Sequence, residues 1–501
     1  MTLARVASAV AAILRPFSLA LLVPAIAALW YEPHDLTVAG VTLPASTYTF
    51  LLAFIGINLV AVPLGLATRA AEEEDLTDRE GYLVVALTWL VVPAAGMLPF
   101  LLANTHPHVV DAYLDTLAAF TTTGFSTLAS PSDLAPGLLL WRAILQWLGA
   151  VAIVALGMAL LSKLTHGGLR LAPLDASVQA SKRLRPKMMD TARSLLWVYA
   201  IATLVLVAGL TALLMHDGAA FKDALFESVL DVFAAFSTGG FARTAFIADT
   251  SFLKLVILAL AMVVGATGYN VITALRAGNW RAALRDPEWR FFLAGMAIVS
   301  AAIVLLLRWR EGVTWTDALV HGTWTTVSSS TSTGLRTATP EGWPTVVIFA
   351  LGVLVFIGGC SGSAAGGLKA FRILILLKIV QRQLRILLHP RAVAPVRVGR
   401  TVLSENAVST AVAFTFTSVL LWLAGTLALA LIEPTLSPMA AASGAAASLS
   451  NAGITFHGFA PGGSLAELNY ASKAVVGALM WLGRLEVFAA LLLFYPASWR
   501  S

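Results

Sequence analysis

Cysteine is almost absent from this sequence, since Cys360 is the single one in 501 residues. One cysteine cannot form an intramolecular disulfide or supply the paired thiolates of a CxxC metal site. Histidine is scarce too, with eight residues scattered along the chain. A membrane-embedded enzyme would need clustered His, Asp or Glu within its spans, so the sequence argues against an enzyme.

Charge is also in short supply. Charged residues make up 12% of the chain and hydrophobic residues 58%, whereas soluble domains carry about 25% charged residues. Apolar runs reach the roughly 20 residues that a spanning helix needs. The sequence therefore predicts an all-α integral membrane protein whose surroundings are the lipid bilayer. It contains no nucleic-acid-binding motif, so we expect no nucleic-acid partner and interpret the basic residues as topology signals.

The apolar runs predict a series of spanning helices. An A-x-A pattern follows the first run, but Pro24 and the second run favour a retained helix over a cleaved signal peptide. By residue number the predicted spans are 6–30, 47–68, 82–103, 138–162, 194–215, 252–275, 290–308, 344–379 (interrupted), 406–432 and 468–495.

Four hydroxyl-rich runs that end in or contain glycine recur between these spans. Their glycines at 124, 239, 334 and 453 are separated by 95 to 119 residues. The runs are Thr121-Thr122-Thr123-Gly124-Phe125, Phe236-Ser237-Thr238-Gly239-Gly240-Phe241, Ser330-Thr331-Ser332-Thr333-Gly334-Leu335 and Leu449-Ser450-Asn451-Ala452-Gly453-Ile454. Each follows a segment too short or too polar to span, near 110–121, 221–236, 316–331 and 437–449.

Such runs suit the passage of a cation. A cation that crosses a membrane must exchange its water shell for fixed oxygens, which rings of backbone carbonyls supply. Carbonyls point into a pore only where the backbone leaves helical geometry, and glycine permits that conformation. We therefore predict ion contacts from Thr122, Thr123, Gly124, Ser237, Thr238, Gly239, Ser332, Thr333, Gly334, Asn451, Ala452 and Gly453.

The order of segments predicts four pseudo-symmetric units of helix, pore helix, filter loop and helix around one pore. A two-helix N-terminal unit, 1–75, precedes them. The predicted repeats are 76–190, 191–288, 289–400 and 401–501.

Basic residues gather in the segments 163–193, 276–290 and 369–400, whereas 31–46 and 433–450 contain no Lys or Arg. The positive-inside rule then places both termini and the basic segments in the cytoplasm.

Several motifs resemble one family. They include the TTTG run, Leu140-Trp141-Arg142, Gln146-Trp147-Leu148-Gly149, Gly358-Gly359-Cys360-Ser361-Gly362-Ser363, Gly366-Gly367-Leu368-Lys369, His389-Pro390-Arg391 and Gly483-Arg484-Leu485-Glu486. The chain resembles the Trk/Ktr/HKT superfamily of potassium transporters, and most closely the bacterial Trk-type membrane subunit. The resemblance covers nearly the whole chain.

The resemblance implies a pore for K⁺ as the transported ion, with no cofactor, in the bacterial inner membrane. It also implies a homodimer that binds cytosolic nucleotide-binding (TrkA-like) regulatory subunits. The fourth run departs from the family pattern, because Asn451-Ala452-Gly453 is followed by Ile454-Thr455 instead of Pro-Gly. A sodium-permeable or sodium/potassium-cotransporting relative therefore stays open, as does a channel or an ion-coupled mechanism.

Two further features concern gating. The segment 358–367 holds five glycines, and glycine within a helix costs about 1 kcal/mol relative to alanine. We expect it to unwind into a loop below the filter, although a close-packed surface of small residues is the alternative. The family resemblance makes it a gate loop, formed by Gly358, Gly359, Gly362, Gly366 and Gly367.

Arg484 falls within a predicted span, where an unpaired charge costs about 2.5–3.5 kcal/mol. We expect it to face the pore beside the gate loop, with a structural ion pair as the alternative. Lys369 either shares this role or extends to the inner interface.

Overall fold

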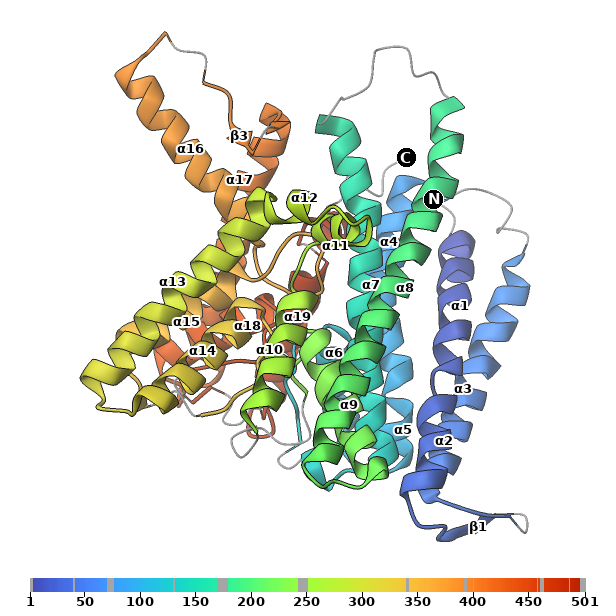
Figure 1. The fold of residues 1–501 in the computed structure, drawn as a ribbon. Helices are drawn as coiled ribbons and strands as arrows, with labels where there is room; N and C mark the ends of the chain where they lie inside the picture. The colour runs from blue at the N-terminus through green and yellow to red at the C-terminus, as the bar shows by residue number, and fades with distance from the viewer. Residues whose placement is uncertain are drawn as a thin grey trace.

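The computed structural model describes residues 3–38, 41–69, 76–128, 131–168, 179–241, 251–338, 342–391, 394–399, 401–456, 458–459, 464–485 and 487–495. Within these ranges the chain is helical except for loops, one 3₁₀ turn and two short antiparallel hairpins (Figure 1). Among the described residues, seven helical segments are long and apolar enough to cross a membrane, or eight if one bent pair is counted as a single span. The all-α membrane class predicted from the sequence is confirmed.

The N-terminal unit packs as a bundle before the first repeat. It consists of α1 (Leu3–Leu19), α2 (Leu22–Tyr31), the hairpin of β1 (Leu36–Val38) and β2 (Val41–Leu43), and α3 (Ala45–Ala67). The first predicted span is thus two helices. Pro24 lies in the first turn of α2, where a missing backbone N–H costs little.

The first two repeats follow. The first contains α4 (Asp78–Gly96), α5 (Leu98–Leu102), α6 (Val109–Phe120), the 3₁₀ turn η2 (Pro131–Asp133) and α7 (Pro136–Gly168). The second contains α8 (Gln179–His216), α9 (Phe221–Phe236), α10 (Phe252–Gly265), α11 (Tyr269–Arg276) and α12 (Trp280–Leu284).

The remaining elements form the third and fourth repeats. The third contains α13 (Pro287–Arg310), α14 (Trp315–Ser330), α15 (Thr345–Ile357) and α16 (Ala370–Leu388). The short hairpin of β3 (Arg397–Val398) and β4 (Thr401–Val402) leads into α17 (Glu405–Ile432), α18 (Pro438–Leu449), α19 (Tyr470–Arg484) and α20 (Phe488–Phe494). The repeat divisions stay a prediction; those at 190 and 288 fall inside α8 and α13, and the one at 75 lies outside the described residues.

The four short helices α6, α9, α14 and α18 form the interior. Their bounds agree with the predicted pore helices to within two residues, and most of their length is buried. Two of them begin at hydroxyl caps, because Thr314 and Ser437 accept the backbone N–H groups of Asp317 and Ala440. The longer helices surround them, and α6 packs between α4, α7 and α19.

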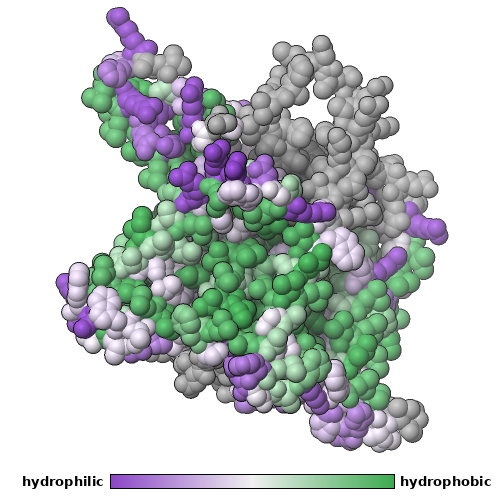
Figure 2. Space-filling view, viewed as in Figure 1, coloured by the Kyte–Doolittle hydropathy of each residue, from purple (hydrophilic) through white to green (hydrophobic). Residues whose placement is uncertain are grey.

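Apolar side chains cover the outside of the surrounding helices. Leu59, Leu204, Phe349 and Leu431 are each at least 65% exposed. Figure 2 shows a broad apolar band between two polar ends of the molecule. A surface of this kind is stable against lipid chains rather than water.

The two ends of the molecule differ. Figure 1 shows α11, α12, the projecting α16 and the beginning of α1 at one end, and the β1–β2 hairpin at the other. Basic residues of 276–290 and 369–391 therefore lie at the α16 end.

Within the described residues, breaks of three residues or more interrupt three of the predicted spans. The sequence predicted the interruption between α15 and α16, and that prediction is confirmed. It predicted continuous helices for 252–275 and 468–495, and both predictions are wrong. The axes of α10 and α11 differ by 105°, and α19 ends at Arg484 before a positive φ of 54° at Val487. Arg484 is therefore the last residue of a helix rather than a mid-helix residue.

Candidate functional site

The four predicted filter loops share one backbone conformation. Thr122, Thr238, Ser332 and Asn451 each have positive φ, between 48° and 55°. In each loop the next residue donates its N–H to a carbonyl one turn back in the short helix, at Ala118, Ala234, Ser328 and Ala447. These matching conformations define the register: residues 122, 238, 332 and 451 are equivalent.

That register corrects one predicted residue. The sequence aligned Gly239 with Gly124, but the glycine equivalent to Gly124 is Gly240, whose φ is positive, at 71°. Gly239 corresponds to Thr123 and needs to be small for another reason: an added Cβ would collide with the Gln146 side chain. The adjacent glycines of the second run left this register ambiguous in the sequence.

The loops form a closed ring. A Cβ at Gly124 would collide with the Gly239 carbonyl oxygen, and a Cβ at Gly240 with the Thr333 carbonyl oxygen. A Cβ at Gly334 would lie 2.7 Å from Gly453 Cα, and one at Gly453 would lie 2.8 Å from the Thr123 carbonyl oxygen. Each repeat thus contacts the next, and the fourth contacts the first. Only glycine allows backbones to approach this closely.

A buried ion pair supports the first loop. Arg142 Nε on α7 lies 3.0 Å from Asp115 Oδ2 on α6. Asp115 Oδ1 also accepts the Ser126 hydroxyl at 2.8 Å and the Thr127 N–H at 3.2 Å. A buried carboxylate that accepts this many hydrogen bonds fixes the segment that leaves the loop.

The same face of α7 supports the second loop. The Arg142 guanidinium lies 3.9 Å from the centroid of the Phe241 ring, and Gln146 Oε1 accepts the Phe241 N–H at 3.1 Å. Two side chains of the first repeat therefore position the residue that follows Gly240. This contact explains why Arg and Gln occur one helical turn apart in the motif that the sequence singled out.

Two buried lysines also pair with carboxylates of the short helices, and sequence reasoning missed both. Lys254 Nζ lies 2.5 Å from Glu227 Oε1 and 2.7 Å from Asp231 Oδ2. Lys473 Nζ, on α19, donates to Asp111 Oδ1 of α6 at 2.8 Å. The sequence did contain a signal: each of two short helices carries two acidic residues four positions apart, at 111 and 115 in one and at 227 and 231 in the other.

Several buried oxygens around the ring have no hydrogen-bond partner among the described residues. They are Thr122 Oγ1, Ser237 Oγ, Thr238 Oγ1, Ser328 Oγ, Ser329 Oγ and Asn451 Oδ1. A buried polar atom without a protein partner needs water or an ion. Each belongs to a predicted filter loop or to the last turn of a short helix. Side-chain oxygens that can still accept or donate a hydrogen bond are therefore concentrated at the ring.

A loop of residues 358–369, which we call the 358–369 loop, joins α15 to α16 directly against the ring. Its Gly366 N–H donates to Ser332 Oγ at 2.7 Å, and a Cβ at Gly366 would collide with the Ser450 carbonyl. The loop also donates two N–H groups to the break between α10 and α11. Cys360 donates to Ala266 and Ala364 to Gly265, at 3.0 and 3.1 Å.

Arg484 and the 358–369 loop are in contact. Arg484 Nη1 donates to the Ala364 carbonyl at 2.9 Å, and the residue is 2% exposed. Its Nε and Nη2 have no hydrogen-bond partner in the described parts of the chain, although the guanidinium lies 5.7 Å from the centroid of the Trp89 ring, and Glu486 lies outside those parts. The alternative of an ion pair with another helix is not seen for the described residues.

Lys369 is buried rather than extended to the membrane interface, so the second of its two predicted placements is wrong. The residue is 7% exposed, and its Nζ donates to the Ala365 carbonyl. Its φ of 75° is unusual for a residue with a Cβ, and strain of this kind occurs where the surrounding structure imposes it. The loop therefore curls around the lysine of its own C-terminal end.

Glu288 is a further contact of this loop that sequence reasoning missed. Its Oε1 accepts the Ser361 N–H at 2.5 Å and the Phe371 N–H at 3.2 Å. The residue lies in the first turn of α13, where the helix dipole favours a carboxylate. Nothing in the local sequence distinguishes it from an interfacial glutamate.

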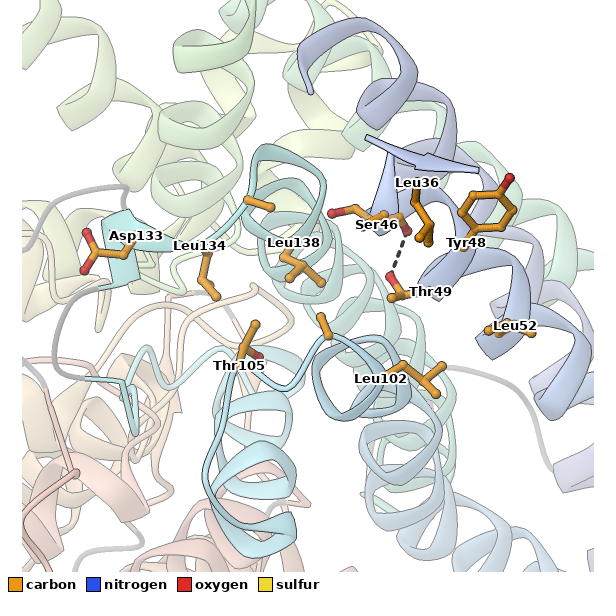
Figure 3. Close-up of a pocket in the computed structure, with 13 residues that line it drawn as sticks. Leu36, Ser46, Tyr48, Thr49, Leu52, Leu102, Thr105, Asp133, Leu134 and Leu138 are labelled. Atoms are coloured by element: carbon orange, nitrogen blue, oxygen red, sulfur yellow. Dashed lines mark hydrogen bonds between the residues drawn. The ribbon is translucent and has the colours of Figure 1, made fainter. Parts of the chain in front are cut away.

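A cavity of about 500 Å³ lies apart from the ring, between the N-terminal unit and the first repeat (Figure 3). It is lined from α3 by Ser46, Tyr48 and Leu52, from α5 by Leu102, and from the segment before α7 by Asp133. None of the predicted site residues lines it.

The chain matches known proteins over nearly its whole length. The family model described as TrkH, cation transport protein, matches residues 49–501. The chain belongs to the TrkH family. The Trk system potassium uptake protein TrkH of Escherichia coli K12 is 31% identical, over 97% of each chain, and that of Vibrio parahaemolyticus is 30% identical, also over 97% of each.

The TrkH-family fold extends over the whole chain. The crystal structure of the potassium transporter TrkH from Vibrio parahaemolyticus matches all of it, with a TM-score of 0.85 at 28% identity. The family model begins within α3, so α1 and α2 lie ahead of the matched region. Membership in a transporter family agrees with the absence of enzyme signatures in the sequence.

Proposed function

We propose that this TrkH-family chain takes up potassium across the cytoplasmic membrane as the pore-forming subunit of a Trk-type system. The observation that carries the proposal is the closed ring in which each filter-loop backbone contacts the next. Both full-length relatives are named for potassium uptake, which supports K⁺ as the transported ion. A family model described as a cation transport protein is consistent with that substrate.

In this proposal the ion contacts are backbone oxygens of the filter loops. We take them to be the carbonyl oxygens of residues 122–123, 238–239, 332–333 and 451–452, which the shared positive φ makes equivalent in the four loops. The unpartnered hydroxyls of Ser328 and Ser329 would keep water at the ring while an ion enters or leaves. Oxygen ligands of this kind replace hydration water without binding the ion too tightly to release it.

The 358–369 loop would act as the gate, together with Arg484. The loop contacts the ring through Gly366, and Arg484 presents a positive charge beside it. A cation on a path past both would be blocked sterically by the loop and electrostatically by the arginine. Opening then requires the loop to move away from the ring.

The orientation follows from charge. The α16 end carries the basic segments, so it would face the cytoplasm together with the start of α1. We place the protein in the bacterial inner membrane with both termini inside. Cytosolic nucleotide-binding (TrkA-like) subunits would bind α16, which projects from the body, and the complete transporter would be a homodimer.

Ion flux into liposomes tests the proposal. Purified protein is reconstituted with and without the cytosolic partner, and reversal potentials are measured in opposing K⁺ and Na⁺ gradients. We expect a current that follows the K⁺ gradient. A current that ignores K⁺, or no ion movement under either condition, would reject it.

One observation favours sodium permeability as the second candidate. Gly124, Gly240 and Gly334 all have positive φ, whereas Gly453 does not. The fourth quadrant of the ring therefore differs from the other three, and a less regular ring discriminates less sharply between ions. Equal reversal potentials in the two gradients would favour this candidate.

A further inference from the structure

The 358–369 loop and the helix that follows it meet at one side chain. Glu288 Oε1 accepts an N–H from the loop, at Ser361, and an N–H from the first turn of α16, at Phe371. A single carboxylate oxygen thus bridges the loop to α16. Hydrogen bonds to a charged acceptor are stronger than those between neutral groups, and both donors are backbone groups that cannot rotate away.

Glu288 also stands between the loop and the end of the molecule that carries α16. Its neighbour Pro287 contacts the β3–β4 hairpin, since a Cβ at Gly399 would lie 3.3 Å from Pro287 Cγ. The hairpin packs in turn against α16 and α17 through Val396, Val398 and Ile375. Figure 1 shows α13 beginning beside α12, at the end from which α16 projects.

Other attachments of the loop lie closer to the ring. Cys360 and Ala364 donate to the α10–α11 break, and Arg484 donates to Ala364. Glu288 therefore connects the loop to the first turn of α16, in addition to the direct hydrogen bonds that Ala370 and Arg372 of α16 donate to the Gly359 and Leu368 carbonyls. A displacement of α16 or of the β3–β4 hairpin changes the distance between its two donors.

We infer that Glu288 is a positioning residue that holds the 358–369 loop against the ring, and that movement of α16 releases it. We call the pair of hydrogen bonds from Ser361 and Phe371 to Glu288 the latch. The expected effect of the latch on ion flow rests on the proposed function, whereas the latch itself does not. Releasing the bridge frees Ser361 and the adjacent Cys360 from their packed position. Loop release and conduction can therefore be measured separately.

Cys360 reports on the loop. It is the single cysteine of the chain and is 2% exposed. We would measure its modification by N-ethylmaleimide in membranes, by mass spectrometry, and K⁺ flux into liposomes without partner. In E288A we expect modification about ten-fold faster or more, because two charge-assisted hydrogen bonds are lost. We expect higher flux without partner in the same variant.

Two variants refine the test. E288Q keeps an acceptor oxygen at the same position and is expected to restore slow modification. E288D withdraws the carboxylate by one methylene and is expected to raise the rate, which keeps the test valid if E288A does not fold. Glu311→Gln, at the exposed other end of α13, is the matched control and should behave as the parent.

The outcomes separate the latch from transport. Slow Cys360 modification and parental flux in folded E288A and E288D would overturn the latch. Fast modification in both variants, with no ion movement in the parent even with partner, would uphold the latch and reject the proposed function. Equal acceleration in the Glu311 control would overturn the inference, since the effect would not be specific to the bridge.

Discussion

The ring of filter loops and the 358–369 loop lie against each other, yet they are held in different ways. In the ring, four glycine positions are packed against neighbouring backbone, and buried ion pairs such as Asp115–Arg142 fix the adjacent segments. The 358–369 loop is held by backbone hydrogen bonds to the α10–α11 break and by hydrogen bonds to individual side chains, Glu288 and Arg484 among them. The difference suggests that the ring is rigid and that the loop can move while the ring stays intact.

The largest expected effect comes from adding one carbon to the ring. Gly240→Ala places a Cβ against the Thr333 carbonyl at a φ of 71°, so we expect loss of K⁺ flux. Gly209→Ala on α8 is the matched control, because no atom lies within 4 Å of its added Cβ. Flux in liposomes measures both, and parental flux in Gly240→Ala would show that the ring is not the ion path.

Gly239→Ser tests the position of Gly239 in the ring. Its Cβ would collide with Gln146, which also accepts the Phe241 N–H, so we expect a lower K⁺-to-Na⁺ permeability ratio rather than complete loss. Reversal potentials measure this ratio. A ratio equal to the parent's would count against a filter at this position.

Breaking the buried pair next to the ring should cost stability. Arg142→Ala leaves Asp115 buried without its cation, a loss of about 3–5 kcal/mol in comparable pairs. Thermal unfolding in detergent measures the destabilisation. Arg382→Ala removes the ion pair with Glu405, which is 71% exposed, and should cost about 0–1 kcal/mol. Similar losses of stability in both variants would contradict the idea that the buried ion pair holds the ring rigid.

Freeing the loop should raise K⁺ flux, whereas adding a Cβ to the ring should abolish it. Deleting part of 362–366, or Arg484→Ala, removes volume or charge beside the ring, so we expect a several-fold higher K⁺ flux in the absence of partner or nucleotide. Liposome flux without partner is the measurement. If both variants fold and conduct no more than the parent, the 358–369 loop is a packing motif and the gate lies elsewhere.

The smallest effect is expected at the surface of α16. Reversing Arg382 and Arg385 should weaken co-purification with a cytosolic regulator, more so at low salt, because exposed charges are screened beyond about 8 Å at physiological ionic strength. The same reversal at Arg308 and Arg310, at the other end of α13 from the α16 end, is the control. Unchanged co-purification and flux would leave the basic residues as topology signals alone.

The sequence alone determined the class, most of the helix bounds and the location of the four loops. Long apolar runs have to become helices in lipid, because every backbone group must be paired. The runs of Ser, Thr and Gly after short helices are local signals, and so is the glycine cluster at 358–367. These features depend on residues close together in the chain, which is why sequence reasoning found them.

Only the tertiary structure decided how distant segments meet. Gly240 rather than Gly239 takes the left-handed conformation because it packs on Thr333, 93 residues further along the chain. The α10–α11 break is stabilised by N–H groups of the 358–369 loop, and Lys473 pairs with Asp111 across the length of the chain. Glu288 resembles any interfacial glutamate until the fold brings Ser361 and Phe371 to its oxygen. A buried hydrogen bond is formed only when both partners arrive, and which partner arrives is a property of the fold.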